Sequence, residues 1–218
     1  YESIMDDGVR AGKLNDSYDA IILPADGAAR MTGDQPPGDG NNFGRRPEDY
    51  PPKYRSGFGK EGVEALEVFV DGGGTLITFA QAGSLPIEKF KLPIRNVLAN
   101  VSSREFWSPG STLRVDVDNT NPLAYGMPDE ALATFLGGNQ VYHVIPSPWN
   151  DQIERVITFK DRDILQSGWL LGEDVIAKKA AMVSVRHGAG KVVLIGFRAQ
   201  HRVQTHGTFK LVFNALIK

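Results

Sequence analysis

The 218-residue sequence contains no cysteine, which excludes disulfides, thiolate nucleophiles and cysteine zinc sites together. It has no excess of positive charge either, with 24 Lys and Arg against 26 Asp and Glu. Nucleic-acid binding is therefore not expected, because it usually needs a basic surface. No apolar run approaches the ~20 residues of a membrane-spanning helix, so no span is expected. The four histidines form none of the short motifs that bind zinc.

What is present is a series of short apolar runs that alternate with helical patterns. Such alternation predicts an α/β fold, with three layers, a mostly parallel open sheet and helices on both faces, as in flavodoxin-like domains. A β-hairpin and a closing helix are expected at the C-terminus. Strands are predicted at 18–24, Thr75–Phe79, Ser111–Val117, 141–145, Ile153–Phe159, 181–185 and 191–197. Helices are predicted at Gly59–Asp71, 128–135, 174–179 and 205–218, with Ser84 as the N-cap of another short one.

Residues 1–218 are interpreted as a single domain, cut from a longer chain because Tyr1 is not an initiator Met. Residues 25–58 are rich in glycine, proline and polar side chains and show no periodicity. Because loops of this length are unusual inside a compact domain, the segment is interpreted as a long polar loop insertion.

The densest group of polar residues lies in 198–206, between the last predicted strand and the last helix. In open α/β sheets ligands gather at the carboxyl ends of the strands. This segment is therefore the candidate site for a small anionic or polar ligand. Helix capping and hydrogen bonds to neighbouring loops are the simpler explanation of the same residues. The candidate residues are Arg198, Gln200, His201, Thr205 and His206.

Asp116 and Asp118 belong to an Asp-x-Asp-x-Thr motif after a predicted strand. In haloacid-dehalogenase-like phosphotransferases, one such carboxylate attacks phosphorus and the second acts as acid and base beside a magnesium ion. The motif lies mid-chain, and Asn121 stands where an apolar residue is typical. A polar turn is the simpler interpretation. Both residues are weak metal candidates, and a magnesium-dependent phosphotransferase remains the alternative function.

Four segments resemble a known family: GFGKEGVEAL (57–66) with FVDGGGTLI (69–77), NPLAYGMP (121–128), GKVVLIGF (190–197), and HGTFK (206–210). Together they are similar to class I glutamine-amidotransferase-like domains. More narrowly, they resemble the domain found C-terminal to the catalytic domain of bacterial zinc carboxypeptidases of the carboxypeptidase A class.

The resemblance implies a nucleophile elbow after the strand Thr75–Phe79, normally with a cysteine, and a histidine near the end of the chain. Here the elbow positions are Ala80, Gln81 and Ala82, which cannot attack a carbonyl, so the elbow is degenerate. His201 falls near the family histidine, but Val203 replaces the acidic residue expected after it. No catalytic residue is therefore expected in this chain.

The resemblance further implies that peptidase activity belongs to an upstream domain that is absent from this sequence. Zinc is expected in that domain, and no cofactor or metal in this chain. The expected function is thus a non-catalytic accessory domain, binding a small polar ligand or docking a partner. The peptidase domain of the same polypeptide is the expected partner. A secreted or periplasmic location follows from the resemblance alone, and the oligomeric state stays open.

Overall fold

The computed structural model describes residues 1–34, 49–145 and 152–217. The helices are α1 (Asp6–Arg10), α2 (Ala28–Thr32), α3 (Gly59–Asp71), α4 (Ser84–Lys89), α5 (Glu173–Ile176) and α6 (Phe209–Leu216). The strands are β1 (Ala20–Leu23), β2 (Thr75–Phe79), β3 (Ile94–Asn96), β4 (Ser111–Val117), β5 (Glu130–Phe135), β6 (Tyr142–Val144), β7 (Ile153–Phe159), β8 (Leu165–Ser167), β9 (Ala180–His187) and β10 (Gly190–Ile195). The 3-10 turns are η1 (Leu14–Asp16), η3 (Pro52–Tyr54), η4 (Ala80–Gly83), η5 (Pro122–Ala124) and η6 (His206–Thr208).

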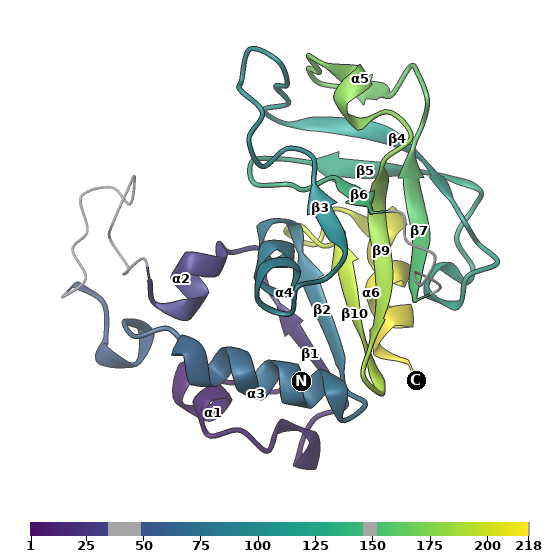
Figure 1. The fold of residues 1–218 in the computed structure, drawn as a ribbon. Coiled ribbons are helices and arrows are strands. Elements are labelled where there is room, and N and C mark those ends of the chain that lie inside the picture. The colour runs from purple at the N-terminus through teal and green to yellow at the C-terminus, as the bar shows by residue number, and fades with distance from the viewer. Residues whose placement is uncertain (35–48, 146–151, 218) are drawn as a thin grey trace.

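These strands form one sheet in the order β1-β2-β10-β9-β7-β4-β5, with β3, β6 and β8 paired beside that path. The predicted α/β fold class is confirmed, as are the C-terminal hairpin of β9 and β10 and the closing helix α6. Figure 1 shows the strands β1, β2 and β10 lying among helices at one end and β4 and β5 at the other.

The expectation of a mostly parallel sheet is wrong. Parallel pairing joins β1 to β2 and β2 to β10, and the other pairings among the described residues are antiparallel. A parallel connection needs a crossover of a dozen or more residues, usually a helix. The helix α3 supplies one between β1 and β2. The hairpin at Gly188 is too short for a crossover, so β9 and β10 run antiparallel.

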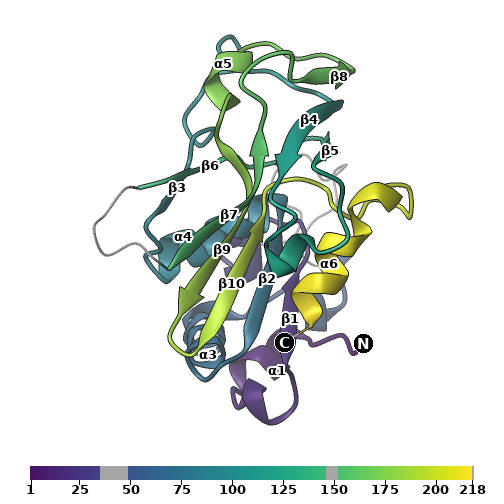
Figure 2. The same ribbon diagram turned by 90° about the vertical axis from the view of Figure 1, so that its right-hand side faces the viewer.

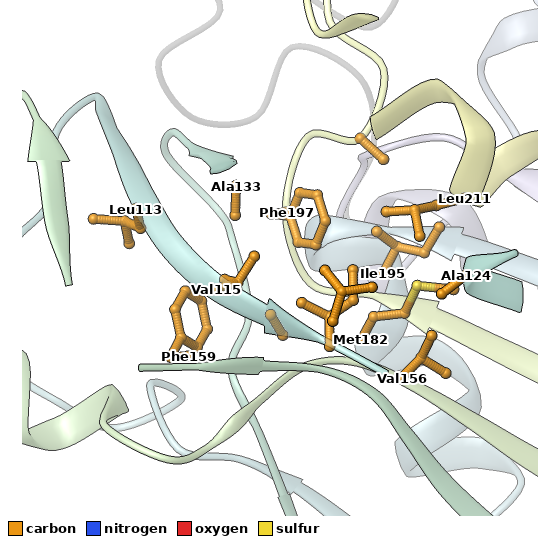
Figure 3. Packing of buried hydrophobic residues seen from close by; sticks show 14 of the residues in the cluster. Leu113, Val115, Ala124, Ala133, Val156, Phe159, Met182, Ile195, Phe197 and Leu211 are labelled. Atoms are coloured by element: carbon orange, nitrogen blue, oxygen red, sulfur yellow. The ribbon is translucent and has the colours of Figure 1, made fainter. Parts of the chain in front are cut away.

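The central strands β2 and β10 are buried on both faces. Leu76 belongs to the apolar cluster on the α3 side, and the next residue, Ile77, belongs to the cluster that includes Leu211 of α6. Figure 2 shows α3 and α6 on opposite sides of these strands. The α6 cluster continues through Met182 to β4, β5 and β7 (Figure 3). A three-layer arrangement is thus present around β2 and β10.

The helix Gly59–Asp71 and the strands Thr75–Phe79, Ser111–Val117 and Ile153–Phe159 match their predicted bounds. The glycines after α3 end it as expected, and Gly73 has a φ of 103°. Ser84 is not the N-cap of α4: Gly83 holds that position, and the Ser84 hydroxyl donates to the Gln81 carbonyl at 2.8 Å.

The helix predicted at 128–135 is also wrong, because this segment forms β5. Its exposure alternates residue by residue, with Ala133 and Phe135 buried and Leu132 exposed. Asp129 and Glu130 suit the first turn of a helix, but pairing with β4 over Ser111 to Asp116 outweighs that local preference.

The predicted loop insertion 25–58 lies partly outside the described residues, at 35–48. Its described parts contain α2 and η3. They meet where Phe58 donates its main-chain N–H to the Met31 carbonyl at 2.9 Å. In the portions of the chain that the structure describes, no helix is long and apolar enough to cross a bilayer.

The hairpin glycine Gly188 gives a test of this packing. It has a φ of 58°, and a Cβ added there would lie 2.5 Å from the Asp71 Cα. Gly12 has a φ of 70° but nothing within 4 Å of an added Cβ. We expect Gly12→Ala to lower the free energy of unfolding by about 1 kcal/mol, the cost of the left-handed conformation. Gly188→Ala should lower it by about 3 kcal/mol because overpacking is added. Urea denaturation measures both, and equal losses would contradict the close contact between hairpin and helix.

Candidate functional site

The chain turns sharply at Ala80, directly after β2. Ala80 has a φ of 47°, which is uncommon for a residue with a Cβ, and η4 and α4 follow at once. A strained strand-to-helix turn of this kind is the geometry that presents a nucleophile in elbow-type enzymes. Here the side chain is a methyl group and is 0% exposed. The corner therefore has the shape of an elbow without a reactive group.

The elbow is covered by the segment that leads from β5 into β6. Gly138 approaches the Gln81 side chain so closely that an added Cβ would collide with its Oε1. Gln140 donates its Nε2–H to the Gln81 carbonyl at 3.4 Å. A Cβ on Gly83 would lie 2.5 Å from the Tyr142 hydroxyl oxygen. The space in front of an elbow nucleophile is thus filled by protein.

Tyr142 holds this cover in place. Its hydroxyl donates to Gln140 Oε1 at 3.2 Å, and the ring is almost fully buried. Burial raises the pKa of the Tyr142 hydroxyl, so the group stays protonated and remains a donor. Two neighbouring buried atoms, Thr78 Oγ1 and Asn139 Oδ1, have no hydrogen-bond partner among the described residues.

The 198–206 segment begins at the same edge of the sheet. Because β10 runs parallel to β2 with Ile195 opposite Phe79, the segments that follow these two strands leave the sheet side by side. Arg198 donates an Nη2–H to the Gly137 carbonyl at 3.3 Å, so it contacts the segment that covers the elbow. This juxtaposition is the one that the carboxyl-end argument predicts.

Two of the four remaining candidate side chains, those of Thr205 and His206, stabilise their own loop. The Thr205 hydroxyl donates to the Ala199 carbonyl at 2.9 Å and accepts the His201 main-chain N–H at 3.0 Å. The His206 ring lies 2.7 Å, through Nε2, from the Val203 carbonyl and stacks on Phe209. Gln200 is exposed and His201 half-buried. A hollow of about 380 Å³ lies between β5 and the stretch 204–208.

Asp116 and Asp118 lie on β4 and just beyond its end, in the antiparallel part of the sheet. Asp116 Oδ1 is 2.7 Å from Lys160 Nζ, which also pairs with Glu130. The hydrogen bonds that the Lys160 ammonium donates to Asp116 and, to a smaller extent, to Glu130 raise the pKa of Lys160. Asp118 Oδ1 accepts hydrogen bonds from the Thr120 hydroxyl and main chain. Across the described ranges, no three acidic or histidine side chains are placed to bind a metal.

Sequence reasoning missed a groove of about 960 Å³ along β1. Apolar and aromatic side chains dominate its lining, among them Tyr18, Ile22, Tyr54 and Phe58, and Arg30 joins them. The run 18–24 signals a buried strand, but it does not reveal that this strand lies at the open end of the sheet. Only the strand order shows that.

No protein-family model matches the sequence, and no curated protein matches it. Solved structures do match. A cytoplasmic protein of Salmonella typhimurium is 12% identical, with a TM-score of 0.53 over 97% of this chain and 77% of its own. A protein of Thermoplasma acidophilum, assigned as part of a GMP synthase, is 10% identical, with a TM-score of 0.53 over 99% and 78%. The likeness supports a glutamine-amidotransferase-like α/β fold, and it shows no link to carboxypeptidases.

Because the chain has no cysteine, a thiol placed at the elbow would be a single-site reporter. We expect the Ala80→Cys thiol to react with Ellman's reagent about 100-fold or more slowly than that of Ala99→Cys, at an exposed loop position, because thiol reactivity requires access. In about 8 M urea, which should unfold the chain, both thiols should react at the same rate. Equal rates in the folded proteins would show an open pocket at the elbow.

Proposed function

We propose that this chain is a non-catalytic accessory domain that acts through docking rather than bond cleavage. The observation that carries the proposal is the buried methyl group of Ala80 at the elbow. Acyl transfer needs an activated nucleophile, and a histidine alone cannot replace it. The filled space in front of Ala80 and the use of Thr205 and His206 within their own loop support the same conclusion.

The finer proposal concerns the partner. The resemblance of segments 57–66, 69–77, 121–128, 190–197 and 206–210 to the C-terminal domain of bacterial zinc carboxypeptidases supports a role beside such a catalytic domain in the same polypeptide. That domain would hold the zinc ion. The resemblance extends the proposal to a secreted or periplasmic location. The groove along β1 supplies a surface large enough for docking.

The proposal is tested by assaying the purified chain for turnover. We expect no hydrolysis of glutamine or of a carboxypeptidase peptide substrate above that of a heat-denatured sample, with or without added zinc. Ammonia release and ninhydrin detection measure the two activities. The wild type is compared with His201→Ala. Turnover by the wild type that this substitution removes would contradict a non-catalytic role.

The phosphotransferase alternative is tested in the same preparation with p-nitrophenyl phosphate and magnesium. We expect equal background rates for the wild type and Asp116→Asn, because the Asp116 carboxylate is paired with Lys160. A magnesium-dependent rate that Asp116→Asn removes would establish the alternative. Glu130→Gln, which removes the other carboxylate on Lys160, is the matched control for loss of an ion pair.

A further inference from the structure

Among the strands that the structure describes, β1 ends the sheet and has one open edge. The Thr75 N–H donates to the Asp19 carbonyl at 3.0 Å, and Ile21 lies opposite Leu76 in the parallel register. In a parallel ladder alternate residues direct their main-chain groups to the neighbour. The N–H and C=O groups of Ala20 and Ile22 therefore point away from β2. Within the described residues, no other segment forms a main-chain hydrogen bond with them.

The groove lies where the next strand of the sheet would be. Val9 of α1 and Leu66 of α3 line it from one helical layer, and Leu216 of α6 lines it from the other. The strand β1 lies between these layers. Figure 2 shows β1 at the sheet border, with α3 and α6 on either side. The hollow thus continues the middle layer of the domain, which is the place of a β-strand rather than of a helix.

At this edge of the sheet, the apolar residues on the α6 face are only partly covered. Ile21 and Leu23 are buried with the α3 cluster, whereas Ile22 on the opposite face is 39% exposed. Leu216 and Ile217 at the end of α6 are 42% and 67% exposed. A strand that filled the groove would be covered on both faces, so it needs a continuous apolar run.

Glu2 and Arg30 place charged side chains at the two ends of the groove. Glu2 lies at the amino end of β1, where it hydrogen-bonds Tyr18. Arg30 lies at the carboxyl end, 3.7 Å from Asp26, and its Nε is buried without a hydrogen-bond partner among the described residues. A strand parallel to β1 would complement this field with a basic residue near Glu2 and an acidic residue near Arg30.

We propose that the open edge of β1 is a docking site for one extended segment of a partner polypeptide. The segment joins the sheet parallel to β1 and carries a basic residue, an apolar run and an acidic residue in that order. A second copy of this chain does not fit, because two concave edges would meet and leave both hollows unfilled. The inference rests on the proposed docking role, for which it names the surface and the kind of segment.

The test uses the peptide acetyl-Lys-Val-Ile-Val-Ile-Asp-amide as a probe, with amide hydrogen exchange of the whole chain read by NMR. The Ile22 amide should exchange freely in the chain alone and slow by about tenfold or more at saturating peptide, because adding a strand protects edge amides. A peptide with proline at the second valine should give no protection, because proline cannot donate to the ladder. Reversing the terminal Lys and Asp should weaken binding.

Two groove variants, Ile22→Lys and Leu216→Lys, should each weaken peptide binding by about tenfold or more, because each replaces an apolar contact with the peptide by a charge. Val68→Lys replaces an exposed apolar residue of α3 outside the groove and should leave binding unchanged. The inference is overturned if the Ile22 amide is already protected, if the peptide gives no protection, or if Val68→Lys weakens binding equally. A dimer that Ile22→Lys dissociates would also overturn it. None of these readouts involves turnover, so the non-catalytic role stands or falls separately.

Discussion

The parallel pairing of β2 with β10 is the constraint on which the rest of the structure depends. Both strands are buried on both faces, so each must be covered by a helical layer. The apolar stripe of α3 covers one face, and Leu211 and Ala215 of α6 cover the other. The hairpin through Gly188 then fixes β9 against β10, and every strand beyond β9 follows in antiparallel order. One pair of strands thereby joins the α/β end of the domain to its antiparallel end.

The same pairing creates the elbow and also closes it. With Ile195 opposite Phe79, the exits of both strands converge, and the chain after β2 must turn at once to begin α4. Ala80 accepts a left-handed conformation there at a cost of about 1–3 kcal/mol, which persists only where the surroundings enforce it. Gly138, Gln140 and Tyr142 enforce it by packing against the turn. The strained residue itself carries only a buried methyl group.

Elements with local sequence signals could be predicted. The prediction is wrong where strand pairing, rather than a local signal, determines the secondary structure. The α3 helix has an apolar stripe and a glycine stop. The run of β2 is short and apolar, and β4 and β7 mix β-branched apolar residues with polar ones, so the bounds of these elements could be predicted. The stretch 128–135 has acidic residues that suit a helix start and a mixed apolar pattern, and its pairing with β4 makes it a strand. Ala80 as an elbow without a nucleophile could be inferred from the residues. The burial of Ala80 could not be predicted, because the segment that covers it, 138–142, lies far along the chain.

The location of the open edge is the part that no local pattern contains. A run such as 18–24 is apolar because both of its faces meet side chains, and that holds equally for a central and an edge strand. Only the strand order shows that β1 has a single neighbour among the described strands, and only the two helical layers show that the space beside it is bounded. Because the elbow is filled and the edge of β1 is open among the described residues, this edge is the docking surface that we propose. The main-chain groups of β1 can pair with a docked strand of any sequence. Specificity for one partner segment must therefore come from Glu2, Arg30 and the apolar walls of the groove.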